Sequence, residues 1–348
     1  MSSIWNNRIS VSIFGEAQAP AIGITIDNLP PGEYINTEEL TAFMARRSSR
    51  VMGDGYENTV PHIMSGVINE RTTGMPLCAF LQNTPKPSAP AEKTPALMRT
   101  GHADYTGAAR YKGFCDVRDS VGFSDRITLP LCFAGAVCGQ ILQRRGIYAG
   151  AHILSIHNMK DNPFDPVNVG RDAVLSVRKK DFPVINDRKG WTMAENIRKA
   201  AEAGETLGGI IECAAINVPA GIGSPVFDGL ENSIAQLVFG IPGVSGLEFG
   251  AGFSAARMIG SQNNDDYYVS DHGYILTKTN NHGGVLGGIS SGMPVTLKVA
   301  VKPPLTKSGS SGAIKVSEAC SVPSLVPCVE AAVNIALLSH MIDYPDFC

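Results

Sequence analysis

The chain has 348 residues, of which 44% are hydrophobic and 18% are charged. This balance suits a compact soluble protein with a large core and excludes a disordered or fibrous chain. The formal net charge of -3 at pH 7 provides no broad cationic surface for nucleic acid or anionic lipid. We therefore expect a small-molecule partner whose negative charges meet local Arg and Lys. No Pro/Ser-rich linker or block of charge divides the sequence, which predicts one domain over residues 1–348.

The eight cysteines include no CxxC pair. Most lie in apolar runs such as LPLCFAGAVC, which favours reduced core residues over disulfides or a zinc site. The first residues, MSSIWNNRIS, lack the apolar stretch of a signal peptide. We also expect no apolar run of the roughly 20 residues that a membrane span needs. The sequence therefore predicts a cytoplasmic protein with no membrane partner and no structural metal.

The first predicted elements are two strands, in residues 9–20 and 22–32, which carry Gly and Pro at their ends. A helix is predicted to begin at Thr37 and to run through Arg47, because Glu38 and Glu39 suit a first helical turn. A polar loop should follow in residues 48–55, and a turn in residues 72–76. Residues 82–95 are polar and Pro-rich, which predicts a surface loop.

Residues 127–144 place small and apolar side chains at helical spacing and end in basic residues, which predicts a buried helix. Two further helices are predicted over Met193–Ala203 and Val329–Met341, and strands in residues 247–261 and 273–281. Helices and strands are interspersed without a regular strand-helix-strand repeat. This order predicts an α+β protein with antiparallel sheets rather than a doubly wound parallel sheet.

The densest glycine signal lies in residues 279–294, TNNHGGVLGGISSGMP, which hold five glycines within ten residues. Its spacing fits neither the dinucleotide-binding fingerprint nor the P-loop. Two interpretations stay open on pattern alone. The segment could be a turn-rich connector, or its backbone N–H groups could approach a flat or phosphorylated ligand.

Several motifs together resemble those of the chorismate synthase family, in the family's order and from about Ile4 to Met341. The matching segments are Gly15-Glu16 with Ile26-Asp27, TTGMP at 72–76, GHADYT at 101–106, SDRIT at 124–128, NVPAGIG at 217–223 and the glycine segment itself. The resemblance implies the family's α+β domain, with antiparallel sheets packed against helices, and a homotetramer.

The resemblance also implies a lyase of the shikimate pathway. Such enzymes remove phosphate and a ring hydrogen from 5-enolpyruvylshikimate 3-phosphate to give chorismate, and they require reduced FMN without net redox change. Carried over residue by residue, the implied catalytic residues are His102, Gln18 and Glu318. The implied substrate-binding residues are Arg46, Arg47 and Arg126, and the implied cofactor-binding residues are Ser124, Gly284, Gly287, Lys302 and Thr306. Six of the positions (Gln18, Arg47, His102, Ser124, Arg126 and Gly287) are expected to line one cleft.

Several positions depart from the family pattern. The family's Gly-Glu-Ser-His is here Gly15-Glu16-Ala17-Gln18, and Gln18 can donate a hydrogen bond but no useful proton. Its Arg-His-Asp is here Val316-Ser317-Glu318, and its triple glycine is Asp119-Ser120-Val121. These changes bring negative charge and bulk towards an anionic flavin, so we expect weakened FMN binding. The alternative function is an altered or inactive paralogue that binds another small anionic ligand or serves as an oligomer partner.

Overall fold

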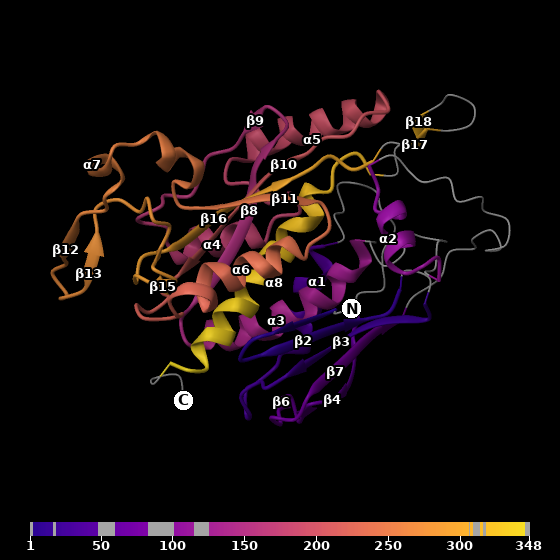
Figure 1. Ribbon diagram of the computed structural model, residues 1–348, viewed down its shortest axis with the longest axis horizontal. Helices are drawn as coiled ribbons and strands as arrows, with labels where there is room; N and C mark the ends of the chain where they lie inside the picture. Colours follow the sequence, from indigo (N-terminus) through magenta and orange to yellow (C-terminus); the bar gives the residue numbers. More distant parts are fainter. Residues whose placement is uncertain are drawn as a thin grey trace.

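The computed structural model describes residues 3–16, 19–47, 60–82, 101–114, 125–305, 307–308, 314–315 and 318–344. Two five-stranded sheets enclose a layer of helices (Figure 1). Every strand pairing in both sheets is antiparallel. The predicted α+β class is therefore confirmed.

The first sheet is built from the amino-terminal part of the chain. In sheet order its strands are β1 (Ile4–Asn6), β2 (Ser10–Phe14), β3 (Ala21–Asp27), β7 (Leu77–Gln82) and β4 (His62–Ser65). Side chains of β7 alternate between buried and partly exposed, as expected of a strand with one face on the core. The two strands predicted nearest the amino terminus correspond to β2 and β3.

The second sheet lies deeper in the molecule. In sheet order its strands are β11 (Val244–Phe249), β16 (Val295–Val301), β10 (Gly209–Ile216), β8 (Tyr148–Ile156) and β9 (Met159–Lys160). β8 and β10 are buried along most of their length on both faces, because α8 packs on one side of the sheet and α4 packs on β8. Without an alternating pattern these strands give no period-two signal in the sequence.

The helical layer contains α1 (Thr37–Ala45), α3 (Thr128–Arg144), α6 (Leu230–Phe239) and α8 (Val322–Met341), while α4 (Arg171–Arg178) and α5 (Asp187–Glu202) lie outside it. α1 begins where predicted because Asn36 caps it, accepting hydrogen bonds from the N–H groups of Glu38 and Glu39. α3 confirms the predicted buried helix, since every residue from Thr128 to Leu142 is buried.

The smaller elements lie at the ends and edges of the two sheets. They are β5 (Val67–Ile68), β6 (Arg71–Thr72), α2 (Asp104–Arg110), α7 (Gly260–Asn263), β12 (Tyr267–Val269), β13 (Ile275–Thr277), β14 (Val285–Leu286), β15 (Ile289–Ser290), β17 (Lys307–Ser308) and β18 (Ile314–Lys315), with short 3-10 helices at Asp125–Ile127, Val226–Asp228 and Gly252–Arg257. The strand predicted over residues 247–261 was wrong beyond Phe249, where a turn, a 3-10 helix and the start of α7 follow.

α8 spans 20 residues, and an 18-residue stretch of it has a mean hydropathy of 1.6 and is 94% buried inside the protein. The expectation that no apolar run reaches membrane-span length was therefore wrong. The two prolines at 323 and 327 obscured the length of the helix, since proline is tolerated in a first helical turn but disfavoured further in. Burial on all sides accounts for the apolar composition, because a fully enclosed helix needs no polar face.

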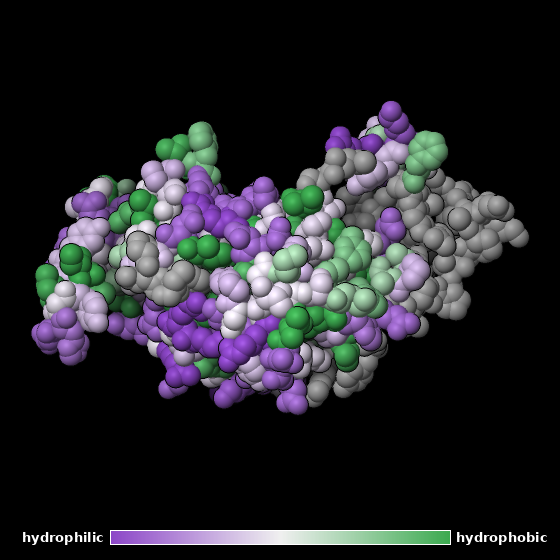
Figure 2. Space-filling model, turned by 90° about the horizontal axis from the view of Figure 1, so that it is seen from below, coloured by the Kyte–Doolittle hydropathy of each residue, from purple (hydrophilic) through white to green (hydrophobic). Residues whose placement is uncertain are grey.

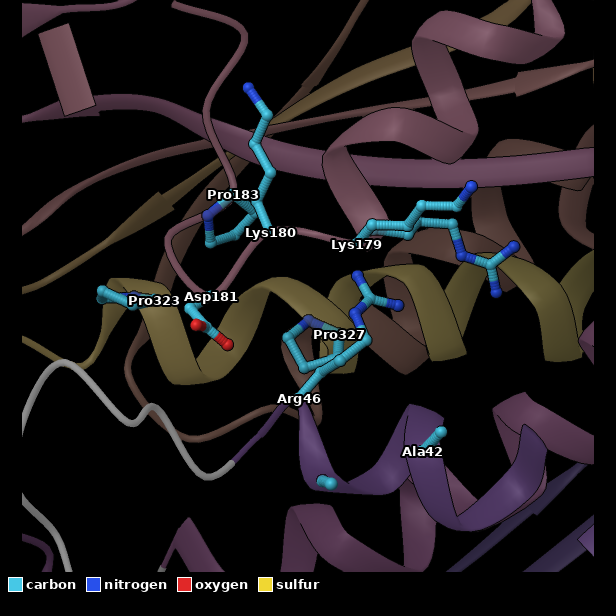
Figure 3. Close-up of a pocket in the computed structure, with 10 residues that line it drawn as sticks. Ala42, Arg46, Lys179, Lys180, Asp181, Pro183, Pro323 and Pro327 are labelled. Atoms are coloured by element: carbon cyan, nitrogen blue, oxygen red, sulfur yellow. The ribbon is translucent and has the colours of Figure 1, made fainter. Parts of the chain in front are cut away.

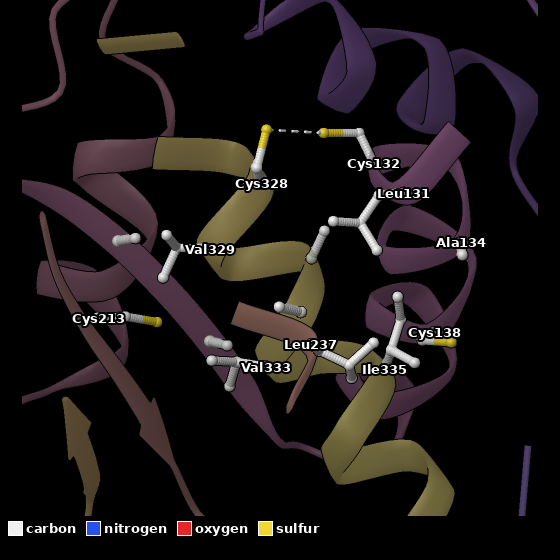
Figure 4. Close-up of a cluster of buried hydrophobic side chains, with 14 of the residues drawn as sticks. Leu131, Cys132, Ala134, Cys138, Cys213, Leu237, Cys328, Val329, Val333 and Ile335 are labelled. Carbon is white, nitrogen blue, oxygen red and sulfur yellow. Dashed lines mark hydrogen bonds between the residues drawn. The ribbon is translucent and has the colours of Figure 1, made fainter. Parts of the chain in front are cut away.

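α3 and α8 cross at very short range in the centre of the core. A Cβ atom at Gly135 of α3 would overlap the Cβ of Ala331 on α8. One turn along, the side-chain amide of Asn334 donates to the carbonyl of Gly135 across 3.2 Å. The buried thiols of Cys132 and Cys328 lie 3.7 Å apart at the same interface (Figure 4). Small residues on α3 thus set the distance between the two helices.

We expect Gly135→Ala to destabilise the fold by about 1–3 kcal/mol, because the added methyl group must push α8 away from α3. Gly170→Ala is the matched control, since a Cβ there meets nothing within 4 Å. Urea unfolding followed by circular dichroism measures both variants. Equal midpoints for the two variants would show that the crossing has room for the methyl group.

Candidate active site

His102 lies immediately before α2 and is held by a carboxylate. Its Nδ1 atom lies 2.6 Å from Oδ1 of Asp104, and both side chains are largely buried, at 13% and 18% exposed. A carboxylate on Nδ1 fixes the tautomer and the ring orientation, which leaves Nε2 to exchange a proton. Sequence reasoning included Asp104 only as part of the GHADYT motif and assigned it no role.

Arg47 follows α1 and is almost fully buried, at 5% exposed. Its Nε atom donates to the Thr128 hydroxyl across 2.6 Å. Thr128 is the first residue of α3 and comes two residues after Arg126, which lies in the preceding 3-10 helix. The structure therefore brings together the segments of two predicted substrate-binding arginines that are far apart in the sequence.

Arg46 points elsewhere and is engaged by a buried carboxylate of α8. Its Nη2 atom lies 2.9 Å from Oε2 of Glu330, and Nε of Arg178 lies 2.7 Å from Oε1 of the same group. Glu330 is fully buried, and both guanidinium groups lie over the ring of Phe43. Arg46 and Arg47 are adjacent in the sequence, but their side chains contact different helices: Arg46 meets Glu330 of α8, and Arg47 meets Thr128 of α3.

The carboxyl end of β16 collects three predicted site residues. The N–H of Lys302 donates to the Gly243 carbonyl across 2.9 Å. Leu305 lies against Gly101, the residue before His102, where an added Cβ would be 3.1 Å from the leucine side chain. The N–H of Leu207, two residues before β10, donates to the carbonyl of Ala319, next to Glu318, across 2.7 Å. His102, Lys302 and Glu318 therefore belong to one end of the second sheet.

The glycine segment lies at the other end of β16. A Cβ at Gly283 would strike the backbone at Gly250, and a Cβ at Gly284 would strike Pro294. Gly288 is packed in the same way against Ser224, whereas a Cβ at Gly287 would meet nothing within 4 Å. These contacts favour the connector interpretation for three of the glycines and leave Gly287 facing open space.

Side chains of the same segment explain its fold. The carboxylate of Asp265 accepts hydrogen bonds from the N–H groups of Asn281 and His282, both at 2.9 Å. These bonds and one from Thr279 lower its pKa, although burial, the largest influence, acts to raise it. The side chain of Asn280 donates to the carbonyls of Pro166 and Pro294 and accepts from Gly284. The polar half of TNNHGG thus holds the turn together.

The described site residues lie in two groups within one protomer, at the two ends of β16. Seven residues of β16 separate Lys302 from the glycine segment, about 20 Å at the usual rise of a strand. His102 lies at the Lys302 end, through Gly101 and Leu305, and Gly287 lies at the opposite end. Motif order in a sequence says nothing about which ends of strands coincide, which is why this separation could not be predicted.

A buried triad elsewhere in the second sheet was missed by the sequence analysis. His152 Nε2 lies 2.8 Å from Oε2 of Glu212, and its Nδ1 lies 3.6 Å from Oδ2 of Asp161. Burial, the largest influence, acts to lower the pKa of His152, but the two carboxylates raise it overall. Asp161 also accepts from the N–H groups of Ile185 and Asn186, so the triad joins β8 and β10 to the start of α5. These contacts give the cluster a role in holding the second sheet and α5 together.

Three predicted site residues, Gln18, Ser124 and Thr306, lie outside the described residues, as do the substituted positions 17, 119–121 and 316. The six cysteines within the described ranges are free, and five of them are buried, as predicted for reduced core residues (Cys132, Cys138, Cys213, Cys320 and Cys328). In the same ranges no group of three or more His, Cys, Asp or Glu is arranged to hold a metal ion.

The comparisons with known proteins agree with this architecture. The chorismate synthase family profile matches residues 9–342. A chorismate synthase of Lancefieldella parvula is 36% identical over 371 residues, covering 99% of this chain and 97% of the relative. One from Thermococcus kodakarensis is 35% identical, covering 96% of each. A crystal structure of a chorismate synthase superposes with a TM-score of 0.78 at 26% identity, covering 97% of this chain and 93% of that one. The chain belongs to the chorismate synthase family.

Proposed function

We propose that this protein is a chorismate synthase-type lyase, which eliminates phosphate from 5-enolpyruvylshikimate 3-phosphate with reduced FMN to give chorismate. The observation that carries the proposal is the His102–Asp104 pair at the end of the second sheet where Lys302 and Glu318 also lie. A histidine oriented by a carboxylate is suited to proton exchange near neutral pH. The positive charge of Lys302 at the same end suits an anionic substrate.

Each residue has a role in this proposal. His102 holds and transfers a proton at Nε2 while Asp104 maintains its tautomer. Arg47 and Arg126 bind the negative groups of the substrate, as guanidinium groups do in partly buried sites. Arg46 helps to position Arg47 from α1, because Glu330 already engages its own guanidinium. Gln18 donates a hydrogen bond to the leaving phosphate.

The proposed FMN site combines Lys302 of one protomer with Gly287 of a neighbouring protomer. Lys302 is exposed and has no ion-pair partner in the described part of the chain, which suits the phosphate of the cofactor. Gly287 has open space where a side chain would be, which suits close approach by a flat ring. When bound, the reduced flavin supplies a transient electron and proton partner for the elimination. Glu318 and the residues Ser124, Gly284 and Thr306 complete the proposed site.

We propose that a homotetramer brings the two separated parts of the site together at an interface between protomers. Within one protomer Gly287 lies at the far end of β16, so it joins the cofactor site of a neighbouring protomer. The hairpin of β12 and β13 projects from this end of the molecule (Figure 1) and exposes Tyr267, Val269, Tyr274 and Ile275. Figure 2 shows hydrophobic residues at the same end. Exposed apolar patches of this kind favour association with a second copy.

We also propose that the protein is a single domain and that it is located in the cytoplasm. A single hydrophobic cluster extends from β1 through the helical layer to β16, which supports one folding unit. α8, although apolar and long, is enclosed by the rest of the protein and therefore supports a core role rather than a membrane span.

Complementation of a chorismate-requiring strain tests the function. Growth that depends on the chain and is lost with His102→Ala is the expected result. The second candidate is an altered paralogue that binds a different small anion or serves as an oligomer partner, and the Ala17, Gln18 and Val316 substitutions favour it. A folded protein that gives no growth and no chorismate in vitro would establish this second candidate.

We expect FMN to bind at least about tenfold more weakly than in a relative with the triple glycine, since one lost charge-assisted hydrogen bond is worth about 1.5–3 kcal/mol. Fluorescence quenching during titration with oxidised FMN measures the affinity. The combined change of Asp119, Ser120 and Val121 to Gly should strengthen binding. No gain from that variant would place the weakness at Val316 or in the segment 303–315, which is shorter than the family pattern. Micromolar or tighter binding by the natural chain would contradict the prediction.

A further inference from the structure

A cationic cavity of about 160 Å³ lies between the end of α1, the segment joining α4 to α5, and the start of α8 (Figure 3). It has room for several water molecules but is smaller than the roughly 300–1,000 Å³ of pockets for drug-sized ligands. Four of its lining residues are cationic, namely Arg46, Arg178, Lys179 and Lys180, and only Asp181 is acidic. The space and the charge fit a small anion.

The positive charge in this cavity is not fully neutralised. Glu330, which lies beneath the two arginines, supplies one negative charge for both. The ammonium group of Lys180 is engaged by the carbonyls of Val184 and Ile185 and by Asp187. Counting Glu330 and Asp187 with Asp181 still leaves four positive charges against three negative ones.

Two of the residues that line the cavity, Arg46 and Lys179, carry polar groups that make no hydrogen bond or ion pair with a described residue. Nη1 of Arg46 is buried and makes no hydrogen bond within the described ranges. Such a donor is costly to leave unmet, so it favours an acceptor that the chain itself does not provide. Lys179 is exposed and forms no ion pair with any described residue. In Figure 3 Arg46 extends from α1 towards the segment of Lys179, whereas Lys180 points away.

We propose that this cavity binds a small phosphate-bearing anion, held by Arg46, Arg178 and Lys179. The cavity is separate from the proposed reaction site, because Arg47 turns to Thr128 and none of His102, Lys302 and Glu318 lines it. The inference therefore does not rest on the proposed function. Two guanidinium groups and an ammonium group give the charge-assisted hydrogen bonds that phosphate oxygens favour.

Calorimetric titration with inorganic phosphate, at an ionic strength matched with sodium chloride, tests the site in the full chain. Lys179→Glu should weaken phosphate binding by at least about tenfold, and Lys179→Gln by a smaller factor. Both variants leave the Arg46–Glu330–Arg178 contacts intact, and circular dichroism checks that they are folded. Lys199→Glu is the matched control, because it makes the same charge change at an exposed position of α5.

The control variant should bind phosphate as the natural chain does. Loss of affinity confined to the Lys179 variants assigns the bound phosphate to this cavity. Equal affinity in Lys179→Glu and the natural chain would overturn the proposal, as would an equal loss in Lys199→Glu. Either result would mean that any phosphate taken up binds elsewhere or responds only to net charge.

Discussion

His102→Ala should lower kcat for chorismate formation by about 10²–10⁴-fold, the usual contribution of a positioned proton-transfer group. The side chain is held by Asp104 at 2.6 Å and is 13% exposed, so no neighbouring water can take its place without losing that orientation. Asp104→Asn should cause a smaller loss, since an amide can still accept a hydrogen bond from the ring but holds it less firmly than a carboxylate does. Steady-state assays of purified protein over a range of pH measure both effects.

His272→Ala is the control for this experiment, because that residue is exposed in a turn between β12 and β13. It should retain full activity. If His102→Ala is as active as the control variant, proton transfer is performed by another group and the assignment of the GHADYT motif to catalysis is wrong.

Glu330→Gln should lower the free energy of unfolding by about 3–5 kcal/mol, because it leaves two buried guanidinium groups without their shared carboxylate. Arg46 and Arg178 are each 16% exposed at the side chain, so water cannot replace the lost charge easily. The amide of glutamine can accept a hydrogen bond from one of them but carries no charge. Chemical denaturation of the two proteins gives the difference directly.

A second variant separates lost charge from lost packing. Adding Arg178→Met to Glu330→Gln removes one of the two unpaired cations, and we expect it to recover part of the stability. Glu195→Gln, which breaks an ion pair with Arg198 on the surface of α5, should change stability little. Equal stability of Glu330→Gln and the Glu195 variant would show that the buried carboxylate is dispensable.

The sequence predicted the fold class and the elements that have an amphipathic or uniformly apolar pattern. α3 was predicted to within a residue, since its small and apolar run ends in basic residues. α5 begins at Asp187 rather than Met193, because Asn186 caps it with a polar first turn that carries no apolar period. β8, β10 and β16 escaped prediction because strands buried on both faces do not alternate.

The site was predicted through motif order more than through chemistry. His102 and Lys302 were selected by resemblance, and the structure adds the partner that orients the histidine and the Gly243 contact that fixes the backbone of the lysine. The sequence could not show that the side chains of Arg46 and Arg47 have different partners. Two adjacent residues at a helix end point in different directions, and only the position of α8 decides which of them meets Glu330.

The burial of α8 has a consequence for how the chain is synthesised. α8 is translated after both sheets, yet it covers α3, β8 and β10, and Ser339 near its end accepts a hydrogen bond from the N–H of Ile9. Until residues 322–341 leave the ribosome, the matching faces of α3 and the second sheet have no cover. The nascent chain therefore exposes an apolar surface until α8 has been synthesised. We expect chaperones that bind exposed apolar surfaces to associate with it during that time.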